Sequence, residues 1–175
     1  DAVTDDAVFI QKFVDFDQPV GPVGLFSALN IDFTQTLSDS ETVPNIVIVD
    51  EGLTNLTGAT WNGFNWRIIN MGEAWFDRPR SAGFSTAPFS DQSYGGFLEG
   101  DPDRPTILGA TGGVVNQLGS YFPGAGAGEL WIDVDLTRQP ITSFVLQEKP
   151  VPEPTTLALL GMAALVGRRR RKKHA

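Results

Sequence analysis

The chain of 175 residues contains no cysteine, and its only histidine, His174, lies behind a run of basic residues at the C-terminal end. The missing cysteines exclude disulfide bonds, thiol nucleophiles, iron–sulfur clusters and cysteine-ligated zinc. A histidine in that position cannot complete a Ser-His-Asp triad or a histidine-ligated metal centre inside a folded domain. We therefore expect no enzymatic activity from these common catalytic centres.

Positive charge is also scarce, except near the C-terminus. The sequence holds 13 Lys and Arg against 21 Asp and Glu, and residues 1–154 carry 7 basic and 21 acidic side chains. This part has a net charge of −14, whereas residues 155–175 carry +6. Because phosphate binding needs clustered Lys and Arg, the acidic part argues against nucleic acid as a partner. Its carboxylates indicate a solvated surface or, more specifically, a site for a divalent cation.

The C-terminal segment has three successive parts. Val151 to Pro154 reads VPEP, residues 155–166 form an apolar stretch with no polar face, and a basic cluster follows. Pro154 fits the first turn of a helix, and a basic cluster behind an apolar helix is held at the cytoplasmic face of a membrane. A helix over 155–166 would be ~18 Å long, against a hydrocarbon core of about 30 Å. The pattern therefore predicts a processing signal rather than a permanent membrane anchor.

This order of parts resembles the PEP-CTERM sorting signal of bacteria. The resemblance implies export by the general secretory route and processing by exosortase, a membrane-embedded transpeptidase resembling a cysteine protease. It also implies that residues 155–166 are held transiently in the inner membrane, and that the processed protein reaches the cell surface or the extracellular exopolysaccharide matrix. Since the sequence begins at Asp1 without a basic, apolar leader, we expect a signal peptide to have been removed. By resemblance, the recognition element is Pro152, Glu153 and Pro154, and the stop-transfer cluster is Arg168, Arg169, Arg170, Arg171, Lys172 and Lys173.

Residues 1–148 predict an all-β domain. Short segments rich in β-branched and aromatic residues alternate in polarity between Gly, Pro, Asn and Asp turns, and no helical window keeps an uninterrupted apolar face. We expect an antiparallel β-sandwich or jelly-roll-like domain, a Pro-rich linker over 149–154, and a short apolar helix with a basic tail over 155–175. A hairpin through Gly72 and long loops over 78–105 are also predicted. The expected strands cover 7–16, 23–33, 45–49, 64–70, 73–76, 114–118, 129–136 and 141–147.

Three tryptophans, Trp61, Trp66 and Trp75, fall within fifteen residues. On a surface they would form a platform for sugar rings, but the hypothesis that they belong to the core is favoured because aromatic side chains contribute large buried areas. Nearby, Asn55-Leu56-Thr57 matches a glycosylation acceptor, but glycosylation there needs a eukaryotic secretory pathway, which the C-terminal segment argues against, so we interpret it as a turn. Residues 55–66 are also similar to a segment that recurs in PEP-CTERM ectodomains.

Carboxylates are the remaining candidates for chemistry. Glu99, Asp101 and Asp103 lie in a Gly- and Pro-containing loop that offers oxygen ligands for calcium, although the EF-hand spacing is absent and a solvated loop is the favoured interpretation. No other cofactor is expected. Asp133 with Asp135, or Glu73 with Asp77, would be the acids of a glycosidase.

Taken together, the sequence favours an exported structural or adhesive protein of the cell surface or extracellular matrix, with no catalytic activity. The alternative is a carbohydrate-binding module of the exopolysaccharide matrix, and a carboxylate-dependent glycoside hydrolase is less favoured. Self-assembly through an exposed strand edge is a further option, because an unpaired strand can recruit another chain.

Overall fold

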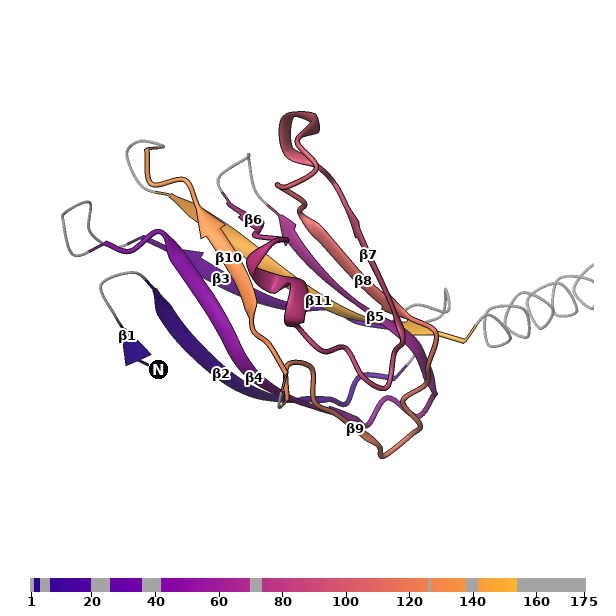
Figure 1. Ribbon diagram of the computed structural model, residues 1–175. Coiled ribbons are helices and arrows are strands. Elements are labelled where there is room, and N and C mark those ends of the chain that lie inside the picture. Colours follow the sequence, from indigo (N-terminus) through magenta and orange to yellow (C-terminus); the bar gives the residue numbers. More distant parts are fainter. Residues whose placement is uncertain are drawn as a thin grey trace, which may run out of the picture.

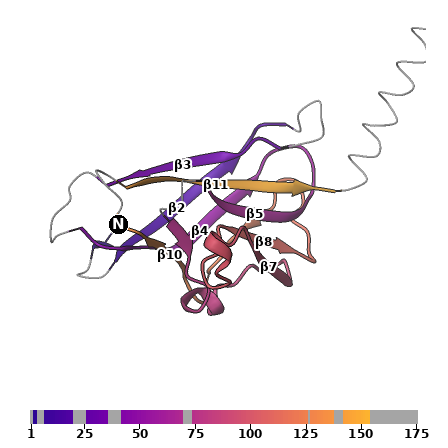
Figure 2. The same cartoon turned by 90° about the horizontal axis from the view of Figure 1, so that it is seen from above.

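The computed structural model describes residues 2–3, 7–19, 26–35, 42–69, 74–125, 127–137 and 142–153. These residues form two β-sheets that pack face to face (Figure 1, Figure 2). The first sheet has the order β1 (Ala2–Val3), β2 (Val8–Phe16), β4 (Asn45–Asn55), β10 (Leu130–Val134) and β6 (Ala74–Phe76), with β9 (Ser120–Tyr121) paired to β4. The second has the order β3 (Leu29–Thr34), β11 (Ser143–Pro152), β5 (Trp61–Ile69), β8 (Ile107–Thr111) and β7 (Asp91–Gly95). Two short 3-10 turns, η1 (Arg80–Gly83) and η2 (Leu98–Gly100), complete the described elements.

The predicted β-sandwich is confirmed, but the prediction of purely antiparallel sheets is wrong. β2 and β4 are parallel, from the pair Val8 and Ile46 to the pair Phe16 and Asn55. The chain leaves β2, forms β3 in the second sheet and then returns to the first sheet as β4. Periodicity along the sequence shows which side chains face inward but not the direction in which neighbouring strands run. The jelly-roll-like arrangement stays a prediction.

Several predicted strand boundaries differ from the observed ones. β4 continues to Asn55 rather than ending near residue 49, and the predicted strand at 114–118 is reduced to an isolated bridge between Val115 and Trp61. The hairpin prediction is wrong, because β5 and β6 belong to different sheets. The region predicted as long loops contains η1, β7 and η2. Short polar strands such as β7, with the sequence DQSYG, give no alternating apolar signal.

Aromatic rings dominate the core between the sheets. Phe64 packs against Trp66, Tyr121 and Trp61 with ring centroids 4.9, 5.6 and 5.9 Å apart. Large aromatic side chains in edge-to-face contact stabilise a core beyond the area that they bury. Other fully buried large side chains are Phe76, Phe84, Ile48, Leu53, Leu108, Leu130, Ile132 and Leu146.

The C-terminal strand β11 lies between β3 and β5 and replaces most of the predicted linker. Its pairing with β5 continues through Lys149, Pro150 and Val151 to Pro152, which is buried opposite Trp61. The linker prediction for 149–154 is therefore wrong over 149–152. Pairing of β11 with β3 ends at Glu148, so Pro150 and Pro152 lie in a part of the strand that pairs with β5 alone. Such a position suits proline, because proline has no backbone N–H to donate to a second strand.

Across the described ranges, no helix is long and apolar enough to span a membrane. The predicted apolar helix at 155–166 and the basic cluster lie outside these ranges.

Candidate functional site

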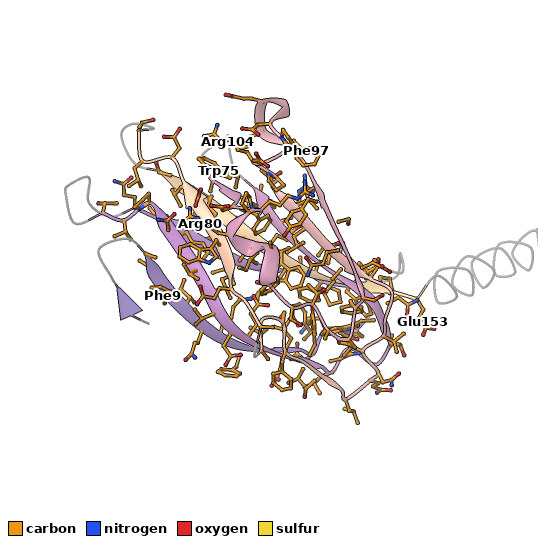
Figure 3. All side chains as sticks on the ribbon, in the orientation of Figure 1. Phe9, Trp75, Arg80, Phe97, Arg104 and Glu153 are labelled. Atoms are coloured by element: carbon orange, nitrogen blue, oxygen red, sulfur yellow. The ribbon has the colours of Figure 1, made fainter. Side chains whose placement is uncertain are left out.

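The predicted sorting motif begins inside the folded domain. Pro152 is the last residue of β11 and is buried, while Glu153 follows it half-buried. Pro154 and the stop-transfer cluster from Arg168 to Lys173 lie outside the described residues. In Figure 3, Glu153 marks the end of β11, at the opposite end of the domain from Trp75 and Arg104. The domain therefore leads into the motif directly from a core strand.

The structure does not bring the three candidate tryptophans together on a surface. Trp61 and Trp66 have no exposed area, and their indole N–H groups donate to Thr57 Oγ1 at 3.3 Å and to the Glu51 carboxylate at 3.2 Å. Both belong to the core, which was the favoured interpretation. Of the three, only Trp75, on β6, points outward, and the Cζ atom of the Arg104 guanidinium group lies 3.9 Å from the centre of its ring.

A second tryptophan joins Trp75 on the outer face of the first sheet. Trp131 of β10 lies two residues before Asp133, on the same side of the strand, and Asp133 is directly opposite Trp75. Its ring contacts Phe9 of β2 edge-on at 6.4 Å and is covered by the Arg80 guanidinium at 4.6 Å. We call Phe9, Trp75 and Trp131 with Arg80 and Arg104 the outer aromatic face (Figure 3). Sequence reasoning missed Trp131 as a surface partner, although its alternation with the inward Ile132 was the available signal.

Arg80 also organises the carboxylates beside this face. It forms ion pairs with Asp77 and Asp133, and its Nη2 donates to Asn45 Oδ1 at 3.0 Å. Burial raises the pKa of Asp133, and the positive charge of Arg80 partly offsets this rise. Asp135 instead accepts the backbone N–H of Thr137 at 3.0 Å. Asp133 is thus held by an arginine and Asp135 closes a local turn, while Glu73 lies outside the described residues.

The acidic loop around η2 is built by local contacts. Asp101 Oδ1 accepts the backbone N–H of Asp103 at 2.9 Å, and Glu99 has a left-handed backbone with φ of 53°. In the part of the chain that the structure describes, no group of three or more His, Cys, Asp or Glu could hold a metal ion. The structure therefore does not assemble the calcium candidates Glu99, Asp101 and Asp103 into a ligand set.

A buried cluster of ionisable side chains lies between the sheets, and sequence reasoning missed it. Lys12 of β2 forms ion pairs with Glu51 of β4 and with Glu148 of β11. The two glutamate side chains have no exposed area, and that of Lys12 is 11% exposed. The signal was present in the alternation, because Lys12 shares its side of β2 with Val14, and Glu148 shares its side of β11 with Leu146. We call Lys12, Glu51 and Glu148 the buried triad.

The two carboxylates of the triad differ in their surroundings. Glu51 accepts the indole N–H of Trp66 at 3.2 Å. Burial, together with the negative charge of Glu51, raises the pKa of Glu148 to about 8, although Lys12 opposes the rise. Glu148 Oε2 and the Tyr121 hydroxyl are buried and have no hydrogen-bond partner among the described residues. Burial and the two nearby glutamates also raise the pKa of Tyr121.

These features define a class of protein: a β-sandwich whose last core strand runs into a Pro-Glu-Pro segment, an apolar stretch and a basic cluster. Residues 150–172 match the PEP-CTERM protein-sorting motif. The chain therefore carries this sorting motif, as the resemblance indicated. The motif implies export, processing by exosortase and sorting to the cell surface. No curated protein and no solved structure matches the chain significantly.

Proposed function

We propose that the protein is a structural or adhesive component of the cell surface or extracellular matrix, without catalytic activity. The observation that carries this proposal is the continuity of β11 with the sorting motif. The matched segment starts at Pro150, two residues before the last pair of the strand, Pro152 opposite Trp61. A load on the C-terminal segment would therefore pass directly into a central strand of the sandwich, as suits a protein that holds other material at a surface.

The chemistry of the described surface supports a role other than catalysis. Glycosidases need two carboxyl groups that are free to face a scissile bond from either side. Asp77 and Asp133 are instead joined through Arg80, and Asp135 is used by Thr137. We therefore expect no hydrolysis of polysaccharide by the purified protein, and measurable turnover of a surface polysaccharide would overturn the proposal.

Deleting residues 154–175 tests the location on which this role depends. This truncation keeps Pro152 and Glu153, so that β11 stays paired. We expect cell fractionation to recover the full chain with the cell surface, and the truncated chain in the periplasm or medium. A Gln18→Ala variant, altered at an exposed position, is the matched control and should follow the full chain. Equal surface recovery of the truncated chain would contradict sorting by this segment.

The adhesive role itself is tested in cells that lack the protein. We expect weaker retention of matrix and weaker cell-to-cell attachment, restored by the full chain but not by the chain truncated after Glu153. Unchanged attachment in the deletion strain would contradict the role while leaving sorting intact.

The outer aromatic face favours carbohydrate binding as a second candidate function. Trp75 and Trp131 flank an arginine-rich surface, with Arg104 and Arg80 lying over their rings. Tryptophan rings stack on sugars, and guanidinium groups bind carboxylates, so an acidic polysaccharide would match this face. In a pull-down with such a polysaccharide, binding should be lost in a Trp75→Ala/Trp131→Ala variant. It should persist in Phe13→Ala, which removes a ring that is 73% exposed four residues beyond Phe9 on β2, outside the outer aromatic face. Wild-type protein that fails to bind would exclude this candidate.

A further inference from the structure

The buried triad places an amine against a carboxyl group in the interior of the sandwich. Lys12 comes from β2 of the first sheet and Glu148 from β11 of the second, 136 residues later in the chain. Lys12 Nζ donates a hydrogen bond to Glu148 Oε1, so that the nitrogen and the carboxyl group are in direct contact. Reacting groups that are held in contact on a rigid frame reach effective molarities of roughly 10⁵–10⁸ M.

The surroundings give the two carboxyl groups of the triad different roles. A carboxylate resists attack by an amine, whereas a neutral carboxylic acid is an electrophile. The raised pKa keeps Glu148 in the neutral acid form at neutral pH, because it is buried beside the negative charge of Glu51. Glu51 accepts the Trp66 indole N–H and contacts Lys12 Nζ, so its carboxylate is placed to accept a proton from the ammonium group.

The geometry points to an intramolecular isopeptide bond between Lys12 Nζ and Glu148 Cδ, formed with Glu51 as the proton acceptor. The Lys12 ammonium group gives one proton to the Glu51 carboxylate, and the resulting amine attacks Cδ of the neutral Glu148. The bond from Cδ to the carboxyl hydroxyl then breaks, and the hydroxyl leaves as water with a second proton from the nitrogen. The products are a neutral amide, one water molecule and a protonated Glu51, so atoms and charge balance without an oxidant or a co-reactant.

Water exclusion favours the amide over its hydrolysis. The side chains of Glu51 and Glu148 have no exposed area, and the cluster lies beside the rings of Trp66 and Tyr121. A dry site limits the return of water to the new bond. The bond would also remove the ion pair and its buried charges, which are costly to keep away from solvent.

The cross-link would join the two sheets at their interior. It ties β2 to β11, and Glu148 lies four residues before Pro152, at the end of the strand that leads to the sorting motif. This inference goes beyond the proposed function, since the bond can form whether or not the protein is adhesive.

Intact-mass spectrometry of the denatured full chain tests the proposal directly. We expect the wild-type chain to be lighter than its sequence by one water molecule. Tandem mass spectrometry of a protease digest should find one branched peptide that joins Lys12 to Glu148. A wild-type mass equal to the sequence mass, or a linkage from Lys12 to Glu51, would overturn the assignment. This measurement needs no variant, so it does not depend on the folding of a mutant.

Variants separate the roles within the triad. The Lys12→Met and Glu148→Ala variants should each have the mass calculated from their sequence, with no water lost. The Glu51→Gln variant should lose water at least tenfold more slowly than the wild type, and its circular dichroism should remain that of a β protein. Lys149→Arg is the matched control, because Lys149 lies on the other side of β11, and it should lose water like the wild type. Unchanged water loss in Glu51→Gln would overturn the role of Glu51, and water loss in Lys12→Met would overturn the bond.

Discussion

At the scale of single residues, Asn55 shows how this domain uses a buried polar side chain. Asn55 has no exposed area, and its Nδ2 donates to the backbone carbonyl oxygens of Ala59, Val115 and Asn116 at 2.8, 3.1 and 3.1 Å. Its Oδ1 accepts the Thr57 hydroxyl at 2.7 Å. The same Oδ1 also accepts the backbone N–H of Thr57 at 3.2 Å, which closes Asn55-Leu56-Thr57 into a turn, as expected.

Replacing Asn55 with Ala should destabilise the protein by about 3 kcal/mol, because buried carbonyl groups lose their donor. Urea denaturation gives the free energy of unfolding. Gln18→Ala is the control at an exposed site and should change it by less than about 0.5 kcal/mol. A loss for Asn55→Ala as small as that of the control would contradict the role assigned to the amide.

The pH dependence of stability reports on Glu148 once Lys12 cannot react with it. In Lys12→Met the pKa of Glu148 stays raised, because burial and Glu51, the two main causes, remain. The folded state then holds a proton that the unfolded state releases above the usual pKa of 4.5. Stability should therefore fall as the pH rises from about 4.5 towards 8, by up to about 1.4 kcal/mol per pH unit.

Denaturant titrations of Lys12→Met across this pH window measure the slope. The Lys12→Met/Glu148→Gln variant lacks the titrating group and should have a flatter profile. Stability that rises with pH in Lys12→Met would contradict a raised pKa.

At the scale of elements, an irregularity in β4 decides which side chains of this strand face the buried triad. Ile10 pairs with Ile48, but Gln11 pairs with Asp50, so Val49 is an extra residue in β4. Before it Ile48 faces the core, and after it Glu51 does. Because side chains alternate along a strand, an unbroken ladder would have pointed Asp50 inward and Glu51 outward. The bulge therefore brings Glu51 to Lys12.

The close approach of β5 and β8 depends on a glycine. A Cβ atom at Gly63 would lie 2.6 Å from the carbonyl oxygen of Ala110, a backbone atom that cannot turn aside. Gly63→Ala should therefore lower the free energy of unfolding by about 2 kcal/mol. Gly95 lies on β7, at the other side of β8, and a Cβ atom there would have open space around it. Gly95→Ala should therefore change the free energy of unfolding very little in the same thermal or urea denaturation. Equal stabilities of the two variants would contradict the steric argument.

The end of β11 is tested by truncation at two positions. A chain that ends after Lys149 loses the pairs of Val151 with Gly63 and Pro152 with Trp61. It should be less stable by roughly 3 kcal/mol, because two buried prolines are lost and part of the core is uncovered. A chain that ends after Glu153 keeps these pairs and should match the full chain within about 0.5 kcal/mol. Equal stability of the two truncated chains would contradict the role of residues 150–152 in the folded domain and would favour a linker there.

At the scale of the whole molecule, the acidic domain and the C-terminal sorting segment are connected through β11. The sorting motif begins at Pro150, inside β11 and within residues 1–154, which carry a net charge of −14, and the proposed cross-link ties this strand to β2. Force applied through the C-terminal segment would therefore bypass most of the chain.

Single-molecule stretching between handles placed outside residues 12 and 148 measures this bypass. The wild-type chain should not gain length from the residues between Lys12 and Glu148. The Lys12→Met variant should extend further by roughly 450 Å, because 136 residues are released at about 3.3–3.6 Å each. Lys149→Arg should behave as the wild type. Full extension of the wild-type chain would contradict a covalent bond.

The sequence by itself determined the β class, the sorting segment and the absence of cysteine- or histidine-based centres. Each of these depends on composition or on the linear order of residues, and the inward alternation of Lys12 and Glu148 was also visible there. Other features depended on the order of strands in the two sheets. Local pattern could not predict that β2 and β4 run parallel, or that the extra residue Val49 turns Glu51 towards the core.

Only the tertiary structure decided that Lys12 meets Glu148. The two residues lie 136 positions apart on strands of opposite sheets, and their contact exists because those sheets face each other. The same packing excludes water from the pair, so the reactivity that we infer belongs to the fold and not to either residue alone.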